Sequence, residues 1–242
     1  MSVWEYANPR RFMAVSARLL PWVAGAAALL CAAGLTWGLF FTPEDFRMGH
    51  SVKIIYIHVP SAFVAINAWF MMLVASLIWL VRRHHVSALA ARAAAPIGLV
   101  MTLVALLTGA IWGKPMWGTY WAWDPRLTAF LILGLFYLGY IALWSAIEAQ
   151  DAAADLTSIL CLVGTVFAVL SRYAAQFWNQ GLHQGASLSL DAEENISDVF
   201  WQPLVLSIAG FTLLFLALVL LRTRTEIRRR RLHSLSLKAR LA

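Results

Sequence analysis

The sequence predicts an all-α membrane protein in which six helices span the bilayer and both termini face the cytoplasm. Hydrophobic residues make up 61% of the 242 residues, and charged residues only 13%, about half the share found in an average soluble domain. Six apolar stretches are each long enough to cross a hydrocarbon core of about 30 Å. Arginine gathers between alternate stretches, a pattern typical of cytoplasmic loops.

Each predicted span has about 20 residues, and the segments between spans are too short for a soluble domain. We therefore expect a single membrane domain, with spans at 19–41, 60–81, 93–112, 127–147, 156–177 and 201–221. The first span follows Arg10, Arg11 and Arg18 and is long enough to cross the bilayer. It is therefore expected to be a retained anchor rather than a cleaved signal peptide.

Positively charged residues determine the predicted orientation. One side collects the arginines before the first span, those at positions 82, 83 and 92, and a basic cytoplasmic tail at 222–242. The other side has fewer cations: Arg47, Lys53, Lys114 and Arg126. The segments 42–59, 113–126 and 178–200 should therefore face outward. The net charge of +7 fits this topology better than a nucleic-acid surface, because the arginines lie at the ends of apolar runs.

Proline is expected in the first turn of several helices, because its missing N–H needs no partner there. The prolines at span starts are Pro60, Pro96, Pro125 and Pro203. His58 should then lie just before the second helix, or one turn deeper if Pro60 is inside a longer, kinked helix. Asp124 is expected to be the N-cap of the fourth helix, with Pro125 at the first helical position.

The segment 112–128 is unusually rich in aromatic residues. It contains Trp112, Trp117, Tyr120, Trp121 and Trp123. One interpretation is the aromatic belt found where helices meet the membrane surface. The other is a shelf for a large planar ligand, which aromatic rings bind with little loss of conformational freedom. Trp117 and Trp121 are four residues apart and would share one face of a short helix.

Histidine supplies the candidate metal ligands. His58 and His183 are both expected on the outer side, near the aromatic segment, and His183 lies between two glycines that would allow close approach of the backbone to a ligand. Two opposed neutral imidazoles would complete the coordination of a haem iron. His50 is a weaker candidate, and its role stays open. His84, His85 and His233 are expected to be solvated.

The two propionates of a haem would need cationic partners. Arg126, Arg172 and Lys114 lie on or near the outer face, and arginine pairs with carboxylate through two parallel hydrogen bonds. Arg126 is the candidate for this pairing. For Arg172 we expect the side chain to extend to the lipid headgroups rather than to bind a propionate, and its functional role stays open.

Several other functions lack their motifs. Cys31 and Cys161 lie inside apolar runs and form no CxxC pair, so we predict neither a redox dithiol nor a covalent haem attachment site. The sequence contains no nucleophile–base pair, Walker motif or glycine-rich phosphate loop that we can identify. We therefore do not expect an enzyme, and any energy from ATP must come from a partner.

Four stretches together carry a family resemblance. They are KIIYIHVPSA at 53–62, APIGLVMTLVALLTGAIWGKP at 95–115, WGKPMWGTYWAWDPRLT at 112–128 and FWNQGLHQGAS at 177–187. The third resembles the tryptophan-rich WWD signature of haem-handling proteins. With its neighbours it resembles the haem exporter protein C family (CcmC) of bacterial cytochrome c maturation, over nearly the whole chain.

The resemblance implies six spans with both termini inside, and it assigns roles to residues. It implies that His58 and His183 are the axial haem ligands. It also implies that a haem platform forms from Trp112, Trp117, Trp121, Trp123 and Asp124. Tyr120 stands where many members have tryptophan, and Pro125 where some have alanine, so a purely stacking role for Tyr120 is less certain.

The resemblance further implies transient, non-covalent binding of haem b at the outer face of the bacterial inner membrane. The expected partners are a periplasmic haem chaperone (CcmE), the ABC transporter subunits CcmA and CcmB, and the small subunit CcmD. The alternatives are a permease that moves haem through the bundle, a cytochrome c haem lyase and a structural permease subunit. Lyases of this superfamily are larger, and the spans here are nearly free of charge at mid-depth, so delivery is preferred.

Overall fold

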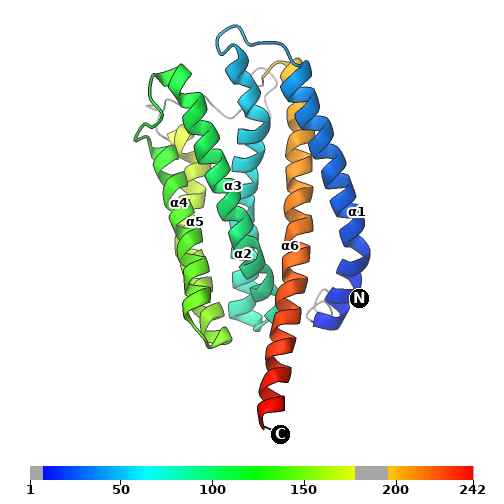
Figure 1. Ribbon diagram of the computed structural model, residues 1–242. Coiled ribbons are helices and arrows are strands. Elements are labelled where there is room, and N and C mark those ends of the chain that lie inside the picture. Colours follow the sequence, from blue (N-terminus) through cyan, green and yellow to red (C-terminus); the bar gives the residue numbers. More distant parts are fainter. Residues whose placement is uncertain (1–7, 178–195, 242) are drawn as a thin grey trace.

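The computed structural model describes residues 8–177 and 196–241, and within them it is a bundle of six long helices (Figure 1). The helices are α1 (Pro9–Thr36), α2 (Ile55–Arg82), α3 (His85–Trp117), α4 (Pro125–Ala146), α5 (Gln150–Phe177) and α6 (Asp198–Leu241). A π-helical turn, η2 (Trp37–Phe41), extends α1, and a 3₁₀ turn, η3 (His50–Ile54), leads into α2. Six helices are long and apolar enough to cross a membrane, which confirms the predicted all-α, six-span fold.

The helices extend beyond the predicted spans. The second and third helices begin at Ile55 and His85, well before the predicted 60 and 93. The apolar stretch marks the part that fits the hydrocarbon core, whereas helical hydrogen bonding continues into the polar ends. As a result, the outer connection between the third and fourth helices covers 118–124 instead of the predicted 113–126.

Among the four prolines, only Pro125 occupies the expected position at the start of its helix. Pro60, Pro96 and Pro203 lie inside α2, α3 and α6, so the prediction that they begin helices is wrong. Membrane helices tolerate interior proline because neighbouring helices and side chains can satisfy the freed carbonyl groups. His58 consequently lies in the first turn of α2 instead of preceding it.

The connection between α2 and α3 has only two residues. Arg83 adopts the left-handed conformation, with a φ of 52°, and ends α2. His84 is half-buried and caps α3, its Nδ1 accepting a hydrogen bond of 3.0 Å from the backbone N–H of Ser87. The prediction that His84 is solvated is therefore wrong. Burial and the neighbouring His85 lower the pKa of His84, which favours the neutral ring that this cap requires.

The core lies among α2, α3, α4 and α5, and α1 packs chiefly on α6 (Figure 1). Trp69 is fully buried and meets Tyr137 edge-to-face, with ring centroids 4.7 Å apart. The Trp69 indole donates to Thr165 at 3.2 Å, and the Tyr137 hydroxyl donates to the carbonyl of Ala65 at 2.7 Å. These bonds satisfy polar groups that would otherwise be buried alone, and so fix the relative positions of α2, α4 and α5.

The bundle has two ends with different chemistry. At the termini end, α1 begins and α6 ends (Figure 1). The opposite, site end contains the segment 42–49, the starts of α2, α4 and α6, and the ends of α3 and α5. The arginine distribution predicts that the termini end faces the cytoplasm, and this orientation stays a prediction.

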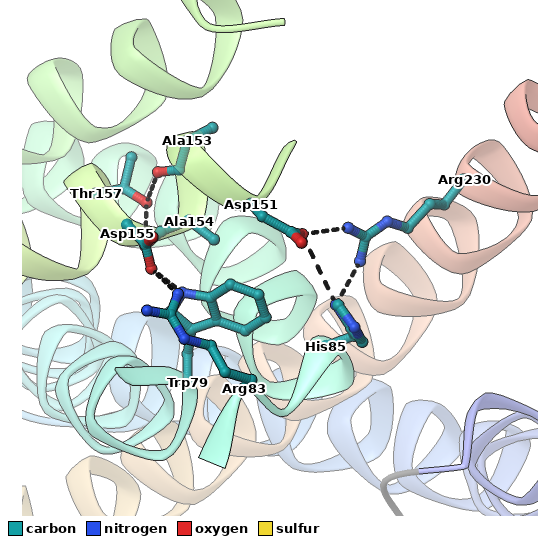
Figure 2. A network of polar contacts seen from close by, with 9 residues as sticks. All are labelled: Trp79, Arg83, His85, Asp151, Ala153, Ala154, Asp155, Thr157 and Arg230. Carbon is teal, nitrogen blue, oxygen red and sulfur yellow. Dashed lines mark hydrogen bonds and ion pairs between the residues drawn. The ribbon is translucent and has the colours of Figure 1, made fainter. Parts of the chain in front are cut away.

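An ion-pair network joins four helices at the termini end (Figure 2). Asp151 of α5 contacts Arg230 of α6 at 2.9 Å and lies 3.9 Å from the Nδ1 atom of His85 at the start of α3. Asp155, one turn along α5, accepts a hydrogen bond of 2.9 Å from the indole of Trp79 and pairs with Arg83. The network links the end of α2 and the C-terminal half of α6 to the starts of α3 and α5.

The basic segment after the last span begins as part of the bundle. The guanidinium of Arg222 donates to the carbonyl of Ala93 at 3.2 Å, and Arg224 donates to Met13 at 2.7 Å. Glu226 is buried and pairs with Arg92 at 3.2 Å. Beyond these contacts α6 continues as a helix that projects past the other helices (Figure 1).

Candidate functional site

A cavity of about 1040 Å³ opens at the site end. Its volume lies near the upper limit for small-molecule sites, which run from about 300 to 1,000 Å³. Six of the predicted site residues line it: His58, Trp112, Trp117, Tyr120, Trp121 and Arg126. They come from α2, from the end of α3, from the connection into α4 and from the first turn of α4.

His58 faces α3 across a close helix contact. Its Nδ1 atom lies 3.1 Å from the hydroxyl oxygen of Thr108. A Cβ atom placed on Gly109 would come within 3.0 Å of the Cε1 atom of the imidazole ring. Glycine at this position therefore lets the half-buried ring rest against the backbone of α3.

The aromatic residues form two edge-to-face pairs. The rings of Trp112 and Trp117 have centroids 5.2 Å apart, and those of Trp121 and Trp123 are 5.5 Å apart. No helix forms over 117–121, because α3 ends at Trp117 and Gly118 takes a φ of 76°. Trp117 and Trp121 thus come from different segments. Trp123 is 77% exposed and does not line the cavity.

Two indole groups beside the cavity lack a hydrogen-bond acceptor. The Nε1 atoms of Trp112 and Trp121 are buried and have no partner within the described part of the chain. An unmade hydrogen bond at a buried donor costs about 1–3 kcal/mol. These two donors therefore favour a ligand, or water, that brings an acceptor.

Asp124 acts on α4 rather than on the cavity directly. Its carboxylate accepts a hydrogen bond of 2.6 Å from the backbone N–H of Leu127, which confirms the predicted N-cap followed by Pro125. Asp124 is 8% exposed and is not among the residues that line the cavity. The cap fixes the first turn of α4, which carries Arg126.

Of the three arginines that line the cavity, Arg126 and Arg172 lie close together. Arg126 of α4 and Arg172 of α5 are close enough for their positive charges to repel each other, and Asp124 offsets part of this repulsion. Across residues 8–177 and 196–241, neither guanidinium forms an ion pair with a carboxylate. Like charges held together in a partly buried site are stabilised when an anion binds between them.

Two carboxylates also line the cavity, and both already have partners. Glu44 lies 2.6 Å from the imidazole of His50. Asp45 accepts the backbone N–H groups of Arg47 and Met48, each at 2.8 Å. These carboxylates stabilise the segment before η3, and His50 points to Glu44 rather than lining the cavity.

The remaining predicted residues are placed differently. Lys114 donates to the carbonyl of Gly118 at 3.0 Å and lies over the ring of Tyr120, so it supports the end of α3. His183 lies outside the described residues. The sequence interpretation missed Thr108 and Gly109. A signal was present, because Thr108 is four residues before Trp112 and therefore shares its helix face.

The comparisons with known proteins identify the family. The model of a family described as "Heme exporter protein C" matches residues 2–238. The chain belongs to the heme exporter protein C family. Together with the six apolar helices, this membership makes the chain a multi-pass protein of the bacterial inner membrane.

Three relatives show the extent of the similarity. The heme exporter protein C of Rhodobacter capsulatus is 72% identical over 242 residues, which is the full length of both chains. That of Paracoccus denitrificans is 68% identical over 97% of each chain. That of Escherichia coli (strain K12) is 41% identical over 92% of this chain and 89% of its own.

Proposed function

We propose that this member of the heme exporter protein C family binds haem b transiently and without a covalent bond at the site end. We further propose that it delivers the haem to the periplasmic chaperone CcmE for c-type cytochrome maturation. The observation that carries the proposal is the cavity lined by an imidazole, three tryptophans and three arginines, of which Arg126 and Arg172 lie close together. In this proposal the site end faces the periplasm.

The shape of the cavity suits a porphyrin. Haem is a large, flat and mostly apolar ring, and indole rings bind such surfaces through stacked or edge-to-face contacts. Trp112, Trp117 and Trp121 supply these contacts from two chain segments. Because Gly109 has no side chain, the imidazole ring of His58 can lie close to α3.

The charges of the cavity suit the propionates of haem. Arg126 and Arg172 would each pair with a carboxylate, and the indole N–H groups of Trp112 and Trp121 would gain acceptors nearby. This assigns to Arg172 a role that its place near a helix end left open. Anion binding would also relieve the repulsion between the two guanidiniums.

The iron would be held by two imidazoles from different segments. His58 lines the cavity, and His183 is proposed as the second ligand from the family resemblance. Haem delivery requires that one axial bond can exchange with a ligand from the chaperone. We therefore expect moderate affinity for haem.

The ABC subunits CcmA and CcmB and the small subunit CcmD are the proposed membrane partners. The sequence carries no recognisable phosphate-binding loop, so a partner must hydrolyse ATP if the cycle requires it. In this proposal the chain is a binding and delivery subunit, and it catalyses no bond formation itself.

Loading of the chaperone tests the proposal. We expect haem to accumulate covalently on co-produced CcmE with the wild-type chain, measured by haem staining of denaturing gels. His58→Ala and His183→Ala should each abolish the signal. His50→Ala is the matched control, because His50 shares the site end but pairs with Glu44, and it should load normally. Normal loading by the His58→Ala/His183→Ala variant contradicts the proposal.

A second candidate function is transport of haem across the bilayer. The cavity follows α2 from Ile55 to Phe70, about 22 Å along the helix axis, and so reaches roughly the middle of this helix. Vesicles that contain haem inside and an apo-haem protein outside distinguish the two functions. Delivery alone predicts no haem transfer above that of protein-free vesicles, whereas rapid transfer would favour a transporter.

A further inference from the structure

We propose that Thr108 is a positioning residue for His58: it accepts the Nδ1 hydrogen of the imidazole and so presents the Nε2 lone pair to the haem iron. This inference rests on the proposed function, because it assumes that His58 binds haem. It assigns to a residue of α3 the task of orienting an iron ligand that comes from α2. The two contacts of the Thr108 hydroxyl carry the argument.

The hydroxyl of Thr108 has one hydrogen atom, and the helix already receives it. The oxygen lies 2.7 Å from the carbonyl oxygen of Val104 and 3.2 Å from that of Ala105. Carbonyl oxygens only accept hydrogen bonds, so Thr108 donates its hydrogen to them. Its contact of 3.1 Å with the Nδ1 atom of His58 must then be one in which the hydroxyl oxygen accepts.

The consequence is a defined tautomer of His58. With the hydrogen on Nδ1, the lone pair of the neutral ring is on Nε2. Histidine ligands of metals ordinarily donate their second N–H to such a partner, which fixes the ring orientation and makes the ligating nitrogen more basic. Gly109 adds to this restriction, because its backbone lies against the edge of the ring.

The same helix contains a matched control. Thr102 is fully buried, and its hydroxyl donates to the carbonyl of Gly98 at 2.8 Å in the same pattern as Thr108 and Val104. Thr102 does not line the cavity. Thr102→Val therefore reports the effect of removing a hydroxyl from α3, and Thr108→Val adds the loss of the acceptor for His58.

The test measures haem binding by the purified full-length chain. Thr108→Val should weaken haem binding by about 10-fold to 100-fold, the range found when outer partners of metal ligands are removed. Thr108→Ser keeps the acceptor and should bind within about twofold of wild type. Thr102→Val should match wild type. The reduction potential of bound haem should rise in Thr108→Val, because a less electron-rich imidazole stabilises ferric iron less.

The outcomes separate this inference from the proposed function. If His58→Ala weakens haem binding while Thr108→Val matches wild type in affinity and potential, the positioning role is wrong and the haem site remains. If His58→Ala itself binds haem like wild type, the ligand assignment in the proposed function is wrong. Should Thr108→Val fail to accumulate, Thr108→Ala provides the second test. It also lacks the acceptor for His58, so it should weaken haem binding and raise the reduction potential, and a match to wild type in both overturns the inference.

Discussion

The two ends of the bundle differ in how their charged side chains are paired. At the termini end, Asp151 and Asp155 pair with cations from other helices, and the indole of Trp79 has a carboxylate acceptor (Figure 2). At the site end, among the residues the structure describes, two arginines share a cavity without a carboxylate partner, and two indole donors have no acceptor. Both ends contain aromatic and basic residues, so composition alone does not distinguish them.

The difference supports the proposed placement of a ligand at the site end. Buried polar groups are nearly always satisfied, and those that are not call for an explanation. At the termini end, the network of Asp151 and Asp155 pairs its charges internally and so contributes to stability, although the buried Trp144 indole and Thr223 hydroxyl at this end also lack partners among the described residues. The site end has donors and positive charge left over beside a large cavity, so an anionic, flat ligand would complete it. Variants at each end should therefore change different properties.

The largest expected effect is at the arginine pair. Arg126→Gln or Arg172→Gln should each weaken haem binding by about 10-fold to 100-fold, because a hydrogen bond to a charged group contributes about 1.5–3 kcal/mol. Titration of purified protein with haem, followed by absorption, measures this. The control is haem with both propionates esterified, which should bind the wild type and both variants equally. If the esterified haem also binds Arg126→Gln more weakly than wild type, the arginines do not bind the propionates.

The next effect is at the termini end and concerns stability. Asp155→Ala removes the acceptor of the buried Trp79 indole and the partner of Arg83, and should destabilise the fold by about 1–3 kcal/mol. Asp155→Asn keeps an acceptor oxygen and should therefore lose less stability than Asp155→Ala. Thermal unfolding in detergent measures both. Haem affinity should remain that of wild type. A loss of haem affinity in Asp155→Ala would contradict the assignment of haem binding to the site end alone.

A smaller effect is expected at Asp124, where one substitution should lower both the stability of the fold and the affinity for haem. Asp124→Ala removes the N-cap of α4 and should cost about 1 kcal/mol. Because the cap holds the turn that carries Arg126, haem affinity should fall several-fold as well. Asp124→Asn preserves capping and should recover most of both losses. If Asp124→Asn binds haem as weakly as Asp124→Ala, the carboxylate charge itself acts on haem and the cap is not its main role.

The smallest effect depends on pH and concerns His84. Burial lowers the pKa of His84 below its ordinary value of 6.5, so the neutral ring stabilises the fold. This contribution is complete above pH 6.5 and is lost as the pH falls through the lowered pKa of the folded state. His84→Asn keeps a capping side chain that does not titrate. The melting temperature of the variant should therefore fall less than that of wild type between pH 8 and pH 5.

Local signals in the sequence predicted the parts of the site that act within one element. Asp124 followed by Pro125 predicted the start of α4, because an N-cap involves only its own helix. The number of spans followed from apolar length. The prolines at 60, 96 and 203 were predicted at helix starts and lie inside helices, because packing against neighbouring helices decides whether an interior proline is tolerated.

Contacts between elements could not be predicted in this way. The hydrogen bond between His58 and Thr108 joins residues 50 positions apart and depends on how α2 crosses α3. The meeting of Arg126 with Arg172 depends on the packing of α4 beside α5. His84 was expected in solvent, yet the two-residue connection between α2 and α3 makes it a helix cap. In each case the residue type was visible and its partner was not.

The absorption spectrum of haem-loaded, purified protein tests the central claim most directly. The wild-type chain and Asp155→Ala should share one low-spin spectrum typical of axial imidazole ligation, because the termini end does not contact haem. His58→Ala should lose that spectrum. A His58→Ala spectrum identical to that of wild type, at the same haem content, would contradict the assignment of the haem site to this end of the bundle.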